Sequence, residues 1–165
     1  MPTKVPIQSI VLTDNVTSSV TFSNIDQSYM DLELVISHKN TGSTSGITIR
    51  FNGSSASYYS STLLYGTGST AGSSKYNSQS YTAIGYTTTS EYAVTKCSIF
   101  DYSNTTTFKS FLSRGGSASY EEDTIVGLWR GSAGSAEAIT SITINAASNY
   151  YGAGTTFDLY GISPV

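Results

Sequence analysis

The residues best suited to catalysis are few in this 165-residue sequence, which contains one histidine, His38, and one cysteine, Cys97. A Ser, Thr or Cys nucleophile usually needs a neighbouring histidine as its base, so a single histidine argues against a hydrolytic triad. His38 is in phase with Leu34 and Ile36 on an apolar strand face, which predicts a packed histidine with no reactive role. Cys97 would be the only other strong nitrogen or sulfur ligand, so we expect no metal site and no cofactor.

Two sets of carboxylates could also support chemistry. Glu121, Glu122 and Asp123 could offer oxygen ligands to calcium, but neighbouring residues of a strand point to opposite faces and no EF-hand pattern surrounds them. We interpret them as a solvated loop that enters a strand. Asp101 and Glu137 could form the acid pair of a glycoside hydrolase, although eleven acidic residues offer many such pairs. No P-loop, G-x-S-x-G or H-E-x-x-H motif is present, so we expect no enzymatic activity.

Aromatic residues are the remaining candidates for binding. Trp129 could stack on a sugar ring, as tryptophans of lectins do, or anchor the core, and we favour the core. Seven of the 13 tyrosines lie between residues 58 and 92. Tyr76, Tyr81 and Tyr86 are flanked by small polar residues that supply no core of their own, so we predict that these three bind a partner. The other tyrosines of this stretch could be half-buried strand residues.

The elements that must position these residues are short strands. Apolar and polar residues alternate with a period of two over residues 30–37, 47–51 and 156–160, which is typical of half-buried strands. Asn-Gly and Gly-rich turns separate about ten to eleven such runs, and no window has a helical period with caps. The sequence therefore predicts an all-β fold, an antiparallel β-sandwich of jelly-roll type. We expect one domain over residues 1–165, with residues 1–8 as an extended N-terminal arm and residues 66–74 as a long flexible loop.

The composition excludes several classes of protein. Ser and Thr occupy 53 positions and charged residues only 19, with a net charge of −3, so there is no cationic face for nucleic acid. No stretch is long and apolar enough to span a membrane, and residues 1–8 lack the apolar segment of a signal peptide. The aromatic content of 12% is that of a folded chain. Lys75 is the only charge between Arg50 and Glu91, so docking at the tyrosines should depend weakly on salt.

Five segments together resemble small structural proteins of tailed bacteriophages. These proteins have a strand leading into F-S-N-I, an alternating D-L-x-L-x-I strand, R-F-N-G followed by a Tyr-rich stretch ending in L-Y-G, and a terminal L-Y-G-I strand. The corresponding segments here are residues 20–25, 30–37, 49–53, 59–66 and 157–162. The resemblance extends over most of the chain, from about residue 10 to residue 162, and its motifs contain no reactive group.

The resemblance implies a virion component that is assembled in the host cytoplasm. We expect a capsid cement or decoration protein that binds the major capsid protein or other virion proteins and stabilises the shell. The chain lacks a coiled-coil shaft, which favours this role over the alternative, a tail-fibre or receptor-binding module of lectin type that recognises a host glycan. Small accessory proteins occupy symmetry points of such particles, so we also expect a homotrimer.

Overall fold

The fold consists of two antiparallel β-sheets of unequal width. The computed structural model describes residues 3–89, 91–117 and 122–163, and all twelve named elements in these ranges are strands. The larger sheet contains, in spatial order, β1 (Thr3–Val11), β12 (Thr156–Ser163), β3 (Asp31–His38), β8 (Ala93–Ile99), β9 (Lys109–Gly116), β10 (Glu122–Trp129), β5 (Tyr59–Gly66) and β6 (Ala71–Gln79). The smaller sheet contains β2 (Ser19–Phe22), β11 (Ile142–Ala146), β4 (Ser45–Phe51) and β7 (Thr82–Thr87).

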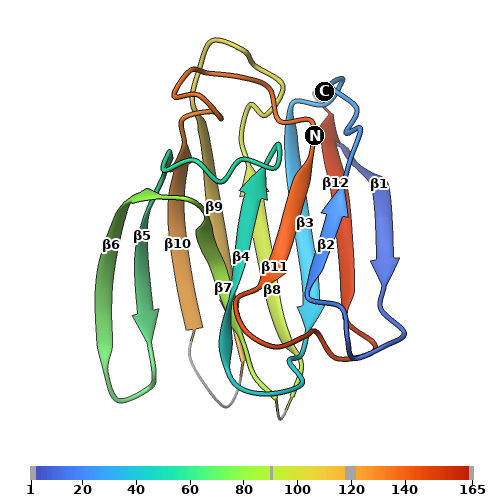
Figure 1. The fold of residues 1–165 in the computed structure, drawn as a ribbon, viewed down its shortest axis with the longest axis vertical. Helices are drawn as coiled ribbons and strands as arrows, with labels where there is room; N and C mark the ends of the chain where they lie inside the picture. Colours follow the sequence, from blue (N-terminus) through green and yellow to red (C-terminus); the bar gives the residue numbers. More distant parts are fainter. Residues whose placement is uncertain (1–2, 90, 118–121, 164–165) are drawn as a thin grey trace.

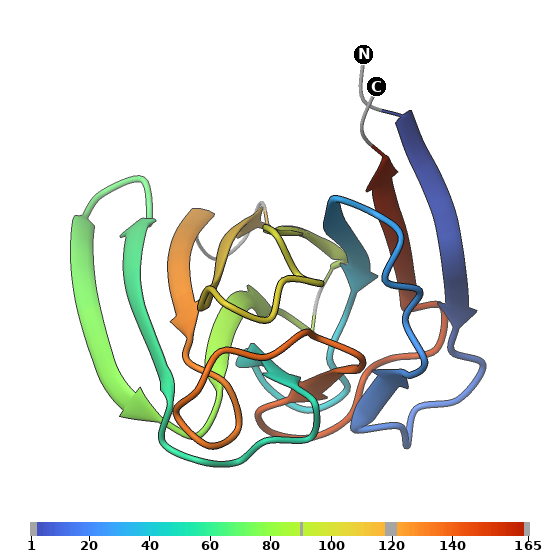
Figure 2. The same ribbon diagram turned by 90° about the horizontal axis from the view of Figure 1, so that it is seen from above.

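The strand order confirms the predicted antiparallel sandwich of jelly-roll type. Strands β1-β12-β3-β8 form one half of the larger sheet, and β2-β11-β4-β7 form the facing sheet. Successive strands cross from one sheet to the other in this part of the chain, which is the winding of a jelly roll. The remaining strands, β9, β10, β5 and β6, extend the larger sheet beyond β8 (Figure 1). Seen from above, the β5–β6 hairpin stands away from the smaller sheet (Figure 2).

The core between the sheets follows from the alternation in the sequence. Leu32, Leu34 and Ile36 of β3 are fully buried, as are Ile47 and Ile49 of β4. An aromatic cluster packs between β4 and the strands that extend the larger sheet beyond β8. Its members are Phe51, Tyr59, Phe111 and Trp129. The rings of Tyr59 and Trp129 are stacked with centroids 6.2 Å apart. This cluster anchors β5, β9 and β10 to the end of β4.

The strand count is higher than predicted because of β6. Residues 66–74 were expected to form a flexible loop, but β5 continues to Gly66 and β6 begins at Ala71, so that prediction was wrong. Both faces of β6 are largely exposed, and its small polar residues therefore have no apolar period to reveal the strand. The extended arm is predicted over residues 1–8. Residues 1–2 lie outside the described residues, and residues 3–8 are extended and form the first part of β1, which pairs with β12.

Within the described residues, no helix is long and apolar enough to cross a membrane.

Replacing Trp129 with Ala should lower the free energy of unfolding by about 3–5 kcal/mol, because a fully buried indole is removed from the aromatic cluster. Urea unfolding followed by circular dichroism would measure the loss. Leu128→Ala is the matched control, since Leu128 is the adjacent residue on the outer face and only half-buried. Equal stability of Trp129→Ala and the wild-type protein would contradict this assignment of the core.

Candidate functional site

The histidine and the cysteine are both buried in the larger sheet and do not form a reactive pair. His38 lies at the end of β3, where Nε2 is 2.9 Å from Oγ1 of Thr95. Desolvation lowers the pKa of His38 to about 3, so the imidazole is neutral, as a packed histidine should be. Cys97 is fully buried beside Leu34, and desolvation raises the pKa of its thiol to about 12. A thiol that stays protonated is a poor nucleophile.

The carboxylates singled out in the sequence take structural positions. Glu121 lies outside the described residues, while Glu122 is exposed and Asp123 is buried, on opposite faces of β10. Among the described residues, no group of three or more His, Cys, Asp or Glu side chains could hold a metal ion. Asp101 accepts a hydrogen bond from the hydroxyl of Thr107, and Glu137 accepts one from the backbone N–H of Ser132. Each therefore stabilises a loop.

A buried lysine lies near both of these acids. The ammonium of Lys109 donates hydrogen bonds to the backbone carbonyls of Asn104 and Thr107. Desolvation lowers the pKa of Lys109, while Asp101 and Glu137 act in the opposite direction. The lysine closes the loop that precedes β9, and this role needs no ligand.

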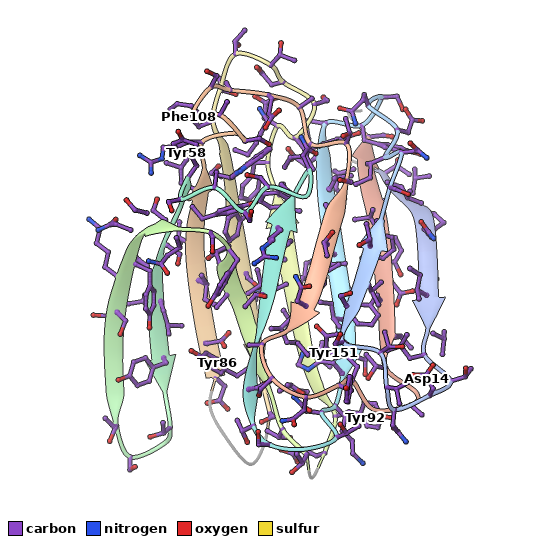
Figure 3. All side chains as sticks on the ribbon, viewed as in Figure 1. Asp14, Tyr58, Tyr86, Tyr92, Phe108 and Tyr151 are labelled. Atoms are coloured by element: carbon purple, nitrogen blue, oxygen red, sulfur yellow. The ribbon has the colours of Figure 1, made fainter. Side chains whose placement is uncertain are left out.

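The three tyrosines predicted to bind a partner line one groove. Tyr76 belongs to β6, and Tyr81 directly precedes β7. Tyr86, labelled in Figure 3, lies near the end of β7, close to the start of β4. We define the tyrosine groove, about 260 Å³ in volume, by the residues that line it: Gly46, Thr48, Ser61, Tyr76, Gln79, Tyr81, Thr82, Ala83, Tyr86 and Ala147. Tyr76 and Tyr81 are 44% and 42% exposed, so their rings are available to a ligand.

The unequal widths of the sheets create this groove. Ser61 pairs with Tyr76 across the β5–β6 hairpin. Both residues lie on the face of the larger sheet that carries Tyr59 and Leu63, the face that is buried elsewhere. The smaller sheet ends at β7, however, and among the described strands none lies opposite β6. Ser61 and Tyr76, which would be core residues in a wider sandwich, therefore line an open groove beside β7.

A second hollow adjoins the groove on the outer face of the smaller sheet. We define the arginine hollow, about 210 Å³, by Thr48, Arg50, Tyr81, Asn145, Ala146 and Ala147. It shares Thr48, Tyr81 and Ala147 with the tyrosine groove. The guanidinium of Arg50 lies 5.7 Å from the ring centroid of Tyr81, and its Nε donates to the carbonyl of Ser80 at 3.3 Å. Arg50 is the only charged residue among those that line either space.

Sequence reasoning did not identify Arg50 and Asn145 as site residues. In the sequence, Arg50 is only part of a strand motif. Its outward position between Ile49 and Phe51 was the one signal that could have identified it as a site residue. Asn145 belongs to β11, far along the chain from β4. Arg50 and Asn145 are brought together only by the register of the β4–β11 pair, in which Thr48 lies opposite Asn145.

Comparisons with known proteins add little to this geometry. No family model matches the chain. No curated protein matches it either. A solved protein of unknown function from Shewanella oneidensis MR-1 is 9% identical over 100% of this chain and 79% of its own, with a TM-score of 0.33. A mutant alginate lyase, solved with an alginate tetrasaccharide, is 10% identical over 95% of this chain and 80% of its own, with a TM-score of 0.28. Likeness at this level says nothing about the ligand or activity of the present chain.

His38 should make the stability of the protein depend on pH. Its pKa is lowered to about 3 in the folded state from 6.5 in the unfolded chain, so the unfolded chain takes up the proton first as the pH falls. Stability should therefore decrease below pH 6.5, by about 2 kcal/mol between pH 7 and pH 5. The pKa of Glu33 is also lowered from 4.5, because desolvation is outweighed by hydrogen bonds and charge from Lys4 and Lys96. The stability that Glu33 contributes is lost only below about pH 4.5, outside the range of this experiment. Urea titrations across pH 5–7 would measure the decrease, and His38→Gln should remove most of it. An unchanged slope in His38→Gln would assign the effect to other groups.

Proposed function

We propose that this chain is a non-enzymatic structural protein of a tailed-bacteriophage particle, a capsid cement or decoration protein that binds neighbouring shell proteins. One observation carries the proposal: Tyr76, Tyr81 and Tyr86, predicted together from the sequence to bind a partner, line one open groove. Tyrosine offers a rigid apolar ring and a hydroxyl at low entropic cost, which suits protein docking. In this role the tyrosine groove accepts side chains of a shell protein.

The motifs of the resemblance support the same proposal through their structural roles. Asn52 of R-F-N-G has a φ of 52°, and its amide holds the segment before β11 by accepting from Thr140 and Ser141 and donating to Ala138. Gly161 of L-Y-G-I lies under the ring of Tyr29, where a Cβ would overlap it. These motif residues therefore have structural roles, as the resemblance to a structural protein implies.

A second candidate function is a receptor-binding module of a tail fibre. One observation favours it: a row of tyrosine rings next to an arginine could also stack on and hydrogen-bond a host glycan. Trp129, the other aromatic considered for sugar stacking, is fully buried and has no part in such a site.

Changing Tyr76, Tyr81 and Tyr86 together to Ser should reduce attachment to the phage shell by about a hundredfold or more, because interface tyrosines often contribute more than about 1 kcal/mol each. Binding to shells stripped of this protein would be measured beside thermal unfolding of the free protein. Tyr92→Ser with Tyr150→Ser is the matched control, since both are exposed outside the groove. Normal attachment of the triple variant, or attachment lost only through unfolding, would refute the docking role.

We also propose that the protein self-associates as a trimer. Every strand of the larger sheet pairs antiparallel with its neighbours, so its two edges, β1 and β6, run in opposite directions. The β6 edge of one copy could therefore continue the antiparallel order beside β1 of the next, and contacts of this kind can close a ring. The edge of β1 carries Pro6, but β6 has no proline and one charge, Lys75.

Light scattering should give the mass of three 17.5 kDa chains. Ser73→Lys adds a second charge to the β6 edge and should favour the monomer, whereas Ser55→Lys, in an exposed loop, should not. A monomeric wild-type protein, both free and on the particle, would contradict the trimer.

A further inference from the structure

We infer that the segment bound at the tyrosine groove carries a carboxylate, from an Asp or Glu side chain or a chain terminus, which pairs with Arg50 in the arginine hollow. The inference rests on the proposed docking function and names the chemistry of the shell protein that this surface fits. It adds Arg50 and Asn145 to the site as residues that set specificity.

The first argument is the unbalanced charge of Arg50. Within the described part of the chain, both ion pairs are made by Glu33, with Lys4 and Lys96, and none by Arg50. Arg50 is half-buried, and its Nε is already engaged by the carbonyl of Ser80. The four N–H groups of its two terminal nitrogens then suit a bidentate carboxylate.

The second argument is that the guanidinium is held in place before a ligand arrives. The Tyr81 ring supports it on one side and the Ser80 carbonyl fixes Nε, so few arginine rotamers remain open. A pre-ordered arginine loses less conformational entropy on binding, and a half-buried one is less screened by water and salt. An ion pair here should contribute more than one on the exposed surface.

The third argument comes from Asn145, which lines the same hollow. Its Nδ2 is buried and has no hydrogen-bond partner among the described residues. A buried amide without an acceptor is unfavourable. An oxygen that enters the hollow beside Arg50 would offer this N–H the acceptor that it lacks. A carboxylate has oxygens for both donors.

The position of the hollow makes side chains, rather than backbone, the basis of recognition. It lies over the outer face of β4, which pairs with β11 on one side and β7 on the other. The backbone groups of β4 are therefore occupied by the sheet, and a bound segment cannot be added as a strand at this point. We expect a loop or terminus that places its carboxylate at Arg50 and an apolar or aromatic side chain between Tyr76 and Tyr86.

Arg50→Gln tests the inference in the shell-binding assay. Affinity for shells should fall at least tenfold, and the dependence of affinity on salt should become weaker, because one charge pair is lost. Wild-type affinity should also fall as the pH drops through the carboxylate range near pH 4, whereas the affinity of Arg50→Gln should change little. Arg114→Gln, an exposed arginine on β9, is the matched control and should bind like the wild type. Thermal unfolding of each variant at each pH separates a loss of binding from a loss of stability. Arg50→Lys is a second variant, which keeps the positive charge but loses the bidentate geometry of the guanidinium.

Each outcome has a distinct meaning. If the wild type and Arg50→Gln bind shells equally, the carboxylate inference is overturned while the docking function stands. If the wild type does not bind shells at all, the docking function fails and the inference fails with it. A parallel titration with trigalacturonate and its methyl ester covers the glycan case. Arg50-dependent binding of the acid but not the ester, without shell binding, would overturn the inference in favour of the receptor-binding candidate.

Discussion

The difference in width between the two sheets determines most of the features of this molecule. A jelly roll in which four strands face four others encloses its own core. Here the larger sheet continues through β9, β10, β5 and β6. The strands nearest the smaller sheet are covered by β7, which contacts β8, β9, β10 and β5, and by the aromatic cluster around Trp129. Among the described strands, β6 extends beyond this cover, and the groove beside β7 lies where the cover ends.

Glycines placed under aromatic rings allow the wide sheet to pack closely. Gly127 of β10 pairs with Phe111 of β9, and a Cβ at residue 127 would overlap the phenyl ring. Gly72 of β6 pairs with Tyr65 in the same way. An aromatic ring that covers a cross-strand glycine protects its exposed backbone and buries the ring at the same time. In the β5–β6 hairpin this pairing adds a side-chain contact between the two strands, where β6 has little other cover.

The sequence predicted the fold well where a strand has one buried face. The alternation in β3, β4 and β12 places Leu34, Ile49 and Phe157 in the core, where the structure has them. The same reasoning missed β6, because a strand exposed on both faces has no apolar period. For the site, local composition was enough to select three tyrosines that converge on one groove. It could not select Arg50 or Asn145, since their proximity depends on the pairing of β4 with β11, which a local pattern does not encode.

The central claim is that the groove left open by the mismatch is the surface through which this protein binds its partner. A cryo-electron map of the parent phage particle tests it most directly. The claim predicts density for this chain on the shell, with atoms of a neighbouring protein in contact with Tyr76, Tyr81 and Tyr86. Density on the shell with the tyrosine groove open to solvent and another face docked, or no density for the chain on the particle, would contradict it.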